Sequence, residues 1–157
     1  MVQWIEGPDR REAIAREVLE ALPDWFGIPE SREAYIRESR AQPFWAELEK
    51  GRPRGFLSLK ETSPYTAEVA VMGVLPEYHR RGIGRALFDA SRQYAQRAGY
   101  AFLQVKTVRE GCYDVYDRTN AFYRSLGFRE LECFPTLWDE KNPCQIYVMA
   151  IGIKQGG

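Results

Sequence analysis

The sequence predicts an α/β protein of the α+β type, with helices on both faces of one mixed, twisted sheet of six or seven strands. At 157 residues the chain has the usual length of one domain, so we treat residues 1–157 as a single domain. Hydrophobic residues make up 45% and charged residues 28%, which is ordinary for a globular protein. The apolar period alternates between helix and strand in the order ααβββαβαββ, and helices that cross between strands imply a mixed sheet.

The first half of the chain predicts two helices followed by three strands. Asp9 can cap the first helix, with Glu12 at the capping-box position, and Ser31 can cap the second. Between the helices, the apolar segment 22–29 reads as a packed loop. Alternation at period 2 then begins, and Pro76 ends the last strand. The expected ranges are helices 10–21 and 32–40 and strands 44–48, 55–59 and 67–74.

The second half predicts a helix, a strand, a second helix and a final pair of strands. Apolar residues at spacings of 4, 3, 4 and 4 mark one face of the first of these helices, which Gly99 ends. We expect the four residues at the end of the chain to be frayed. The expected ranges are helix 82–98, strand 101–108, loop 109–117, helix 119–126, strands 128–134 and 145–151, an irregular segment 135–143 and the tail 154–157.

Charge and cysteine content exclude several classes of protein. The 22 basic and 22 acidic residues give a net charge of zero, whereas a dedicated nucleic-acid binder carries a positive excess. Three cysteines without a CxxC pair indicate a reduced, intracellular protein without a zinc site. The sequence has no apolar run of about 20 residues and no secretory signal, so we expect a cytoplasmic protein that takes no membrane partner.

A glycine-containing turn follows the strand that ends near Val74 and opens the next helix. Free N–H groups at a helix start bind anions, and glycines let a phosphate approach the backbone. The turn lacks the GxxxxGK[ST] pattern of a P-loop, and Leu87 stands where a dinucleotide fingerprint requires Gly or Ala. The alternative to a phosphate-binding turn is a tight turn with a purely structural role. A nucleotide-binding protein that uses this turn is a weaker alternative. The residues concerned are Gly82 and Gly84 with Arg80, Arg81 and Arg85.

The segment His79–Gly84 resembles motif A of the GCN5-related N-acetyltransferases (GNAT family), R/Q-x-x-G-x-G/A, except that His79 replaces Arg or Gln. The resemblance implies that the backbone amides of this loop hold the pyrophosphate of acetyl-CoA. It also implies a bulge in the preceding strand near Met72–Val74, which would offer backbone groups to the pantetheine arm, with the Val74 N–H as oxyanion donor. The loop residues it assigns to the cofactor are His79, Arg80, Arg81, Gly82, Ile83, Gly84 and Arg85.

The segment Thr119–Phe128 resembles the second GNAT signature, a helix that ends in F/L-Y-x-x-x-G-F. The resemblance, which covers about residues 44–150, makes Tyr123 the general acid; a buried core aromatic is the alternative. Relatives often have Asn seven residues and Ala four residues before this tyrosine, where this chain has Tyr116 and Thr119. Either residue, with Thr119 our choice, would replace the usual pantetheine contact.

The chemistry of acetyl transfer asks for a base, because an alkyl amine has a pKa of about 10.4. Glu68 is our first candidate and Glu132 our second, with a surface carboxylate as the alternative for each. His79 lies at the wrong end of the cofactor for this role. Cys144 reads as a small buried apolar residue, so direct transfer in a ternary complex is favoured over a ping-pong route.

The predicted function is therefore acetyl-CoA-dependent acetylation of a primary amine of a small molecule or peptide, without a metal. The alternative is a non-catalytic acyl-CoA-binding or sensor domain. A homodimer is possible because related domains are often dimers. Three loops that combine aromatic and acidic residues could line the acceptor site. They are segments 25–28, 110–117 and 134–142.

Overall fold

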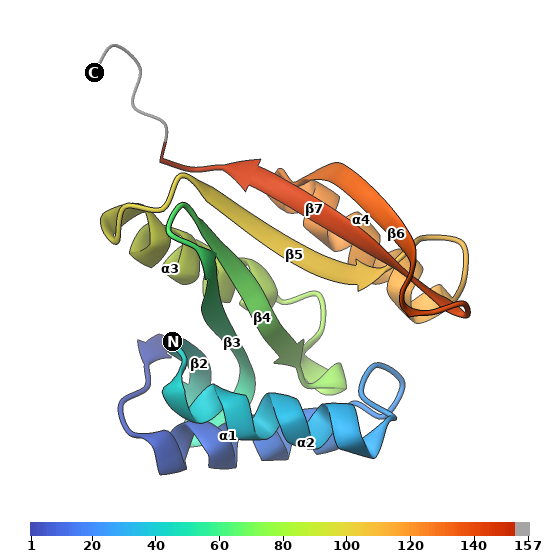
Figure 1. Cartoon of the computed structure of the whole chain (residues 1–157). Coiled ribbons are helices and arrows are strands. Elements are labelled where there is room, and N and C mark those ends of the chain that lie inside the picture. The colour runs from blue at the N-terminus through green and yellow to red at the C-terminus, as the bar shows by residue number, and fades with distance from the viewer. Residues whose placement is uncertain (153–157) are drawn as a thin grey trace. The chain divides into compact units, whose positions relative to one another are not determined.

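The computed structural model describes residues 1–152, so the expected frayed tail 154–157 lies outside the described residues. Four α-helices and seven strands follow one another, with two short 3-10 helices between them (Figure 1). The elements are β1 (Val2–Trp4), α1 (Pro8–Glu20), α2 (Pro29–Glu38), η1 (Ser39–Ala41), β2 (Phe44–Glu49), β3 (Arg52–Ser63), β4 (Thr66–Val74), η2 (Pro76–Tyr78), α3 (Ile83–Arg97), β5 (Phe102–Val108), α4 (Asp114–Leu126), β6 (Arg129–Asp139) and β7 (Asn142–Ala150).

The strands form one mixed sheet in the order β1-β2-β3-β4-β5-β7-β6. The β4–β5 pair is parallel, while β1–β2, β2–β3, β5–β7 and β6–β7 are antiparallel. This confirms the predicted mixed sheet at seven strands. The strand that the sequence analysis missed is β1, which has three residues and pairs with β2 at the edge.

The chain divides into two compact units, which we describe separately. The first unit contains residues 1–60 and 69–94, and the second contains residues 61–68 and the chain from residue 95 onward. The two units therefore share the strands β3 and β4 and the helix α3.

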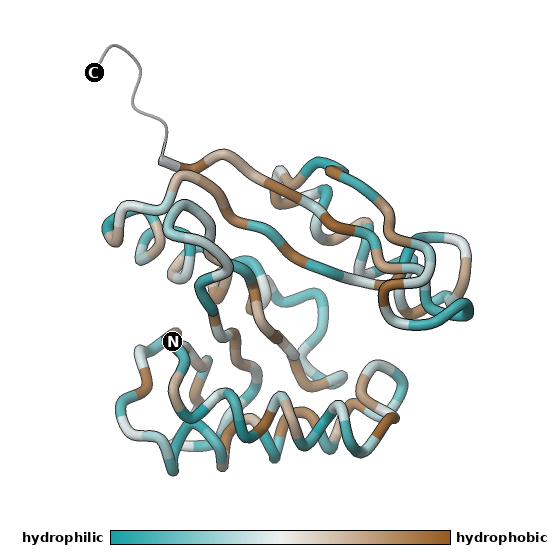
Figure 2. Tube along the Cα trace, viewed as in Figure 1, coloured by the Kyte–Doolittle hydropathy of each residue, from teal (hydrophilic) through white to brown (hydrophobic). Residues whose placement is uncertain are grey.

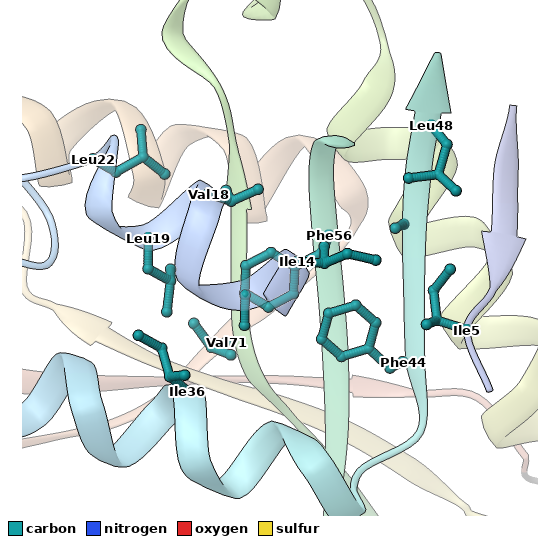
Figure 3. Packing of buried hydrophobic residues seen from close by; sticks show 12 residues of the cluster. Ile5, Ile14, Val18, Leu19, Leu22, Ile36, Phe44, Leu48, Phe56 and Val71 are labelled. Carbon is teal, nitrogen blue, oxygen red and sulfur yellow. The ribbon is translucent and has the colours of Figure 1, made fainter. Parts of the chain in front are cut away.

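The first unit has a core in which α1 and α2 pack against the strands. Figure 3 shows side chains from both helices around the stacked rings of Phe44 and Phe56, whose centroids lie 5.0 Å apart. Polar and apolar residues alternate along α1, as expected for a helix with one buried face (Figure 2). The core residues are Ile5, Ile14, Ala15, Val18, Leu19, Leu22, Ile36, Phe44, Ala46, Leu48, Phe56 and Val71.

Two glycines allow the end of β4 to fit into this unit. A Cβ on Gly73 would lie 2.8 Å from Leu22 Cδ1 and 3.1 Å from Val18 Cγ1, so the helix α1 packs directly on the strand backbone there. A Cβ on Gly55 of β3 would lie 2.9 Å from the carbonyl oxygen of Gly73. Close packing therefore accounts for the glycine at position 73, which lies within the segment Met72–Val74 where a bulge is expected.

The helix starts differ from the predicted caps. Pro8 and Pro29 occupy the first turns of α1 and α2, where the missing N–H of proline costs no helical hydrogen bond. The N-cap positions are Gly7 and Ile28. Asp9 therefore lies inside the first turn, where it accepts a hydrogen bond from Arg40 at 2.8 Å. The predicted capping roles of Asp9 and Ser31 are wrong, although both helices are present.

The second unit is built around the antiparallel strands β5, β7 and β6, with α4 packed on them. Here α4 begins at Asp114, five residues before the predicted start, and shortens the expected loop 109–117. The predicted irregular segment 135–143 is also wrong, because β6 continues to Asp139 and pairs there with Asn142 of β7. Pro135 lies in the edge strand β6, in the stretch between the paired residues Phe134 and Asp139 where the register with β7 shifts, a position that tolerates proline.

In the described residues 1–152, no helix has the length and apolar character needed to cross a membrane.

Candidate active site

The turn predicted to bind phosphate lies in the first unit, between β4 and α3. After η2 the backbone enters the left-handed region twice, with φ of 64° at Arg80 and 78° at Gly82. A Cβ at Gly82 would meet no atom within 4 Å, so the backbone conformation and not crowding calls for glycine there. Arg80 adopts a conformation that is uncommon for a residue with a side chain, which is typical of functional loops.

This turn delivers the chain to the start of α3. The carbonyl oxygen of Gly82 accepts the first helical hydrogen bond, from Ala86 N at 3.0 Å. The N–H groups of a first helical turn have no intrahelical acceptor and carry the positive end of the helix dipole. Ile83 is buried and anchors the helix, while the side chains of Arg80, Arg81 and Arg85 are exposed. The turn thus has the features of an anion-binding site.

His79 connects this turn with the end of the preceding strand. Its ring nitrogen Nε2 lies 2.7 Å from the carbonyl oxygen of Val74, and its ring meets that of Trp25 edge-on at 6.0 Å between centroids. The resemblance to motif A assigns His79 to the cofactor, a role that stays a prediction. The structure shows an exposed histidine whose Nε2 is bonded to the backbone of β4.

Tyr78, at the end of η2, contacts two arginine side chains next to the turn. The guanidinium carbons of Arg54 and Arg81 lie 4.7 Å and 5.4 Å from the centroid of its ring, within cation–π range. Tyr78 also lines a cleft of about 430 Å³ with Leu75, Glu77, the end of α1 and the β2–β3 turn. The lining of this cleft combines the Tyr78 ring with both basic and acidic side chains.

The segment Met72–Val74 forms the end of β4 and leads into this turn. Met72 and Val74 are partly exposed, and Leu75 N donates a hydrogen bond to Arg54 O at 2.8 Å. The bulge expected here stays a prediction. The parallel pairing of β4 with β5 spans Thr66–Glu68, at the other end of the strand and within the second unit.

Tyr123 lies in the second unit, in the last turns of α4, which ends at Gly127 with φ 107°. The residue is 7% exposed. Its ring contacts the rings of Phe122, Phe128 and Tyr147, at centroid distances of 5.8, 5.9 and 6.2 Å. The position combines an apolar ring environment with the helix end that the second motif predicted.

A buried hydrogen-bond network holds α4 beside Tyr123. The Tyr147 hydroxyl donates to Asn120 Oδ1 at 2.6 Å, and Asn120 Nδ2 donates to the carbonyl oxygens of Val108 and Tyr116. Arg124 donates to the Tyr147 oxygen at 3.2 Å. Burial raises the pKa of Tyr147, against the opposing effect of Arg124, so the hydroxyl keeps its proton. Sequence reasoning missed this network, although Asn120 at a helical position was a signal.

Arg124 extends the network to the surface through two hydrogen bonds to Glu110, at 3.0 and 3.2 Å. The bonds to Glu110 raise the pKa of Arg124 above its ordinary value. Glu110 belongs to a segment expected to line the acceptor site, which stays a prediction, and in the structure it is bonded to α4 through Arg124. Asp117 of α4 accepts a hydrogen bond from Gly111 N of the preceding loop at 2.7 Å. Asp139 accepts one from Lys141 N at 2.9 Å within the β6–β7 turn.

Thr119, the candidate pantetheine contact, is half-buried on α4. Its hydroxyl donates to the carbonyl oxygen of Val115 at 3.1 Å, a bond within the helix. The cofactor role of Thr119 stays a prediction.

Glu68 is the buried carboxylate of the second unit. It is 4% exposed, and its Oε1 accepts a hydrogen bond from Gln104 Nε2 at 2.7 Å and lies 3.3 Å from Lys106 Nζ. The alternative that Glu68 is a surface carboxylate is therefore wrong. Glu132, the second candidate for the base, is exposed.

All three cysteines are free, and Cys144 is fully buried. Burial raises the pKa of its thiol to about 11, so it is not a thiolate at neutral pH. In residues 1–152, no cluster of three or more His, Cys, Asp or Glu side chains could hold a metal ion.

Comparison with known proteins shows the family to which the chain is related. A family model described as "Acetyltransferase (GNAT) domain" matches residues 39–130. The peptidyl-lysine N-acetyltransferase YiaC of Escherichia coli is 30% identical over 129 residues, which cover 82% of this chain and 74% of that protein. The N-alpha-acetyltransferase RimI of Mycobacterium tuberculosis is 38% identical over 77 residues, which are 49% of this chain and 44% of RimI. The matched region thus spans less than half the length of RimI.

Solved structures share the fold. A protein from Desulfovibrio desulfuricans assigned to the GNAT family superposes with a TM-score of 0.82 at 18% identity, covering 97% of this chain and 99% of the other. The acetyltransferase yncA of Salmonella typhimurium, solved with acetyl-CoA, gives a TM-score of 0.71 at 15% identity, with 99% and 96% covered. The domain match, the YiaC relationship and the shared fold together show that the chain belongs to the GNAT family of acetyltransferases.

Proposed function

We propose that this protein transfers the acetyl group of acetyl-CoA to a primary amine of a peptide or small molecule. The observation that carries the proposal is the turn into α3, where φ is positive at Arg80 and Gly82 and the helix opens beyond them. The N–H groups of its first helical turn, which lack intrahelical acceptors, and its exposed arginines suit a pyrophosphate. The structural neighbour yncA has acetyl-CoA as its cofactor, which supports the choice of acyl donor.

The residues proposed to hold the donor are those of the turn and of the strand before it. Gly82, Ile83 and Gly84 supply backbone amides to the pyrophosphate, and Arg80, Arg81 and Arg85 supply positive charge. His79 holds the turn in place. Met72 and Val74 offer backbone groups to the pantetheine arm, Thr119 offers a hydroxyl, and the Val74 N–H stabilises the oxyanion. The thioester supplies an acyl carbon that is open to attack by an amine.

Two side chains of the second unit would handle the protons. Glu68, an acceptor in a buried environment, takes the proton of the acceptor ammonium, directly or through a water. Tyr123 donates a proton to the leaving thiolate. Cys144 is no plausible nucleophile, because its thiol has a pKa of about 11. This supports direct transfer in a ternary complex.

The acceptor class is inferred from the relatives. RimI is an N-alpha-acetyltransferase and YiaC a peptidyl-lysine N-acetyltransferase, so a peptide or protein amine is our first choice. A nucleic-acid partner is not proposed, because the chain has no net positive charge, and neither is a membrane partner, because the sequence has no long apolar run. The free cysteines fit a reducing compartment, and we propose the cytoplasm and, by analogy with related domains, a homodimer.

Calorimetric titration of acetyl-CoA into the purified protein tests the proposal, with ATP and NADH as controls. We expect selective binding of acetyl-CoA. Release of the CoA thiol should then follow when a peptide with a free N-terminal amine or a peptide with a lysine is added. Binding of ATP or NADH alone would reject the assignment of the donor, whereas acetyl-CoA binding without transfer to any amine would favour the non-catalytic acyl-CoA-binding alternative.

A further inference from the structure

The ring of Tyr78 is contacted by two guanidinium groups that come from different elements. The guanidinium carbon of Arg54, on β3, lies 4.7 Å from the ring centroid, and that of Arg81, in the turn before α3, lies 5.4 Å from it. All three residues belong to the first unit, so these contacts lie within one compact body. One aromatic ring therefore links the candidate phosphate-binding turn to a strand of the sheet.

Main-chain hydrogen bonds fix the position of Tyr78 relative to β3. Leu75 N donates to the carbonyl oxygen of Arg54 at 2.8 Å, and Tyr78 N donates to that of Leu75 at 2.9 Å. The side chain of Arg54 is 20% exposed and forms an ion pair with Glu49 of β2. This pair offsets the positive charge of Arg54, so its guanidinium repels that of Arg81 less. The ring is thus held from the side of the sheet.

The turn on the other side of the ring contains a backbone conformation that is unfavourable for a residue with a side chain. Arg80 has φ of 64°, in the left-handed region. Next to it, the Arg81 side chain is exposed, and within residues 1–152 it forms no ion pair and no side-chain hydrogen bond. The contact with the Tyr78 ring is therefore the interaction that restrains the Arg81 guanidinium.

We propose that Tyr78 is a positioning residue for the acyl donor, because its ring holds Arg81, and with it the turn, in the conformation that receives the pyrophosphate. The inference rests on the proposed function, in which this turn binds acetyl-CoA. A guanidinium has five N–H donors, and those of Arg81 form no hydrogen bond within residues 1–152. The ring contact thus leaves donors for an anion.

Preorganisation is the physical basis of the expected effect. A loop that must be ordered before it binds a ligand loses affinity, because the free energy of ordering is subtracted from that of binding. Without the ring, the Arg81 side chain would sample more conformations, and the disfavoured φ of Arg80 would have less support. The energy of a cation–π contact at an exposed site corresponds to a change in affinity of about two- to fivefold.

The test is a double-mutant cycle read by calorimetric titration of acetyl-CoA. Tyr78→Leu removes the ring, Tyr78→Phe keeps it without the hydroxyl, and Arg81→Gln removes the cation. Arg80→Gln provides the matched control background. Arg80 belongs to the same turn, but the cations that contact the ring in residues 1–152 are those of Arg54 and Arg81. Circular dichroism and urea unfolding check that each variant is folded.

We expect Tyr78→Leu to weaken the binding of acetyl-CoA about two- to fivefold, and Tyr78→Phe to stay near wild type. In the Arg81→Gln background, Tyr78→Leu should have no further effect, because the cation that the ring positions is gone. In the Arg80→Gln background, the loss caused by Tyr78→Leu should remain in full. A residue that only supports the fold would not produce this selective coupling.

Three results would overturn the inference. They are equal affinities of Tyr78→Leu and wild type, a loss from Tyr78→Leu that is the same in all three backgrounds, and a loss from Tyr78→Phe as large as that from Tyr78→Leu. If wild type itself does not bind acetyl-CoA, the donor assignment of the proposed function fails and this inference fails with it. That result differs from the other three, in which wild type binds.

Discussion

The imidazole Nε2 of His79 lies 2.7 Å from the carbonyl oxygen of Val74. Because a carbonyl oxygen only accepts, Nε2 must carry the hydrogen, and the neutral ring is the Nε2–H tautomer. This bond joins the start of the candidate phosphate-binding turn to the last residue of β4. The histidine is thereby an internal clamp, and its replacement of Arg or Gln in motif A has a structural explanation, since all three residues can donate.

Replacing His79 with Leu removes the clamp, while His79→Gln restores an amide donor at similar reach. A net hydrogen bond contributes about 0.5–1.5 kcal/mol, so the Leu variant should bind acetyl-CoA about two- to tenfold more weakly, whereas the Gln variant stays near wild type. Calorimetry measures both affinities. Equal affinity of the Leu variant and wild type would show that the turn holds its conformation without the bond.

Replacing Tyr123 with Phe removes the proposed general acid but keeps its ring packing against Phe128 and Tyr147. We expect kcat to fall about 100-fold or more, with the affinity for acetyl-CoA unchanged. Steady-state kinetics and calorimetry separate the two effects. Tyr113→Phe is a suitable control, because Tyr113 is exposed. Unchanged turnover of the Tyr123 variant would mean that another group protonates the thiolate.

Replacing Tyr147 with Phe tests the buried network on α4. The change deprives Asn120 Oδ1 of its 2.6 Å donor and Arg124 of a partner, so the free energy of unfolding should fall by about 1–3 kcal/mol. Tyr113→Phe loses only a long exposed bond of 3.4 Å to Lys141 O and should change stability little. Urea unfolding at pH 7 measures both variants, and equal midpoints would count against the network.

Cys144 makes stability depend on alkaline pH. Burial raises its pKa from 9.0 to about 11, so the unfolded chain loses this proton first. The contribution of the neutral thiol is complete below pH 9 and is lost as the pH rises toward 11. Only wild type loses this contribution, whereas the other titrating groups affect wild type and Cys144→Ala equally. The urea midpoints of the two proteins should therefore converge between pH 9 and pH 11. A constant difference from pH 8 to pH 11 would contradict the assignment.

Patterns of nearby residues in the sequence predicted those helices and turns that depend mainly on residues close in the chain. The spacing of apolar residues predicted α3, and the two glycine-bearing motifs identified the turn at Arg80–Gly82 and the helix end at Gly127, where the backbone is left-handed. These features depend on residues that are close in the chain. The short edge strand β1 gave no such pattern, because three residues are too few to show an alternation.

Contacts between distant strands could not be predicted in the same way. Nothing near Glu68 in the chain indicates that Gln104 and Lys106 lie beside it, because that contact depends on the register of a parallel pair. The burial of Glu68, which excludes a surface carboxylate, therefore emerged only in three dimensions. Likewise, the length of β6 depends on its pairing with β7.

The aromatic rings beside the edge strand of the first unit give this part of the chain its own optical signature. The rings of Trp4 and Trp45 lie 5.3 Å apart, and Tyr94 lies 5.7 Å from the first and 5.2 Å from the second. Indoles at such separation couple their excited states, so we expect an exciton band in circular dichroism that disappears when these rings separate. Because all three residues belong to the first unit, the band would report on the melting of that unit alone.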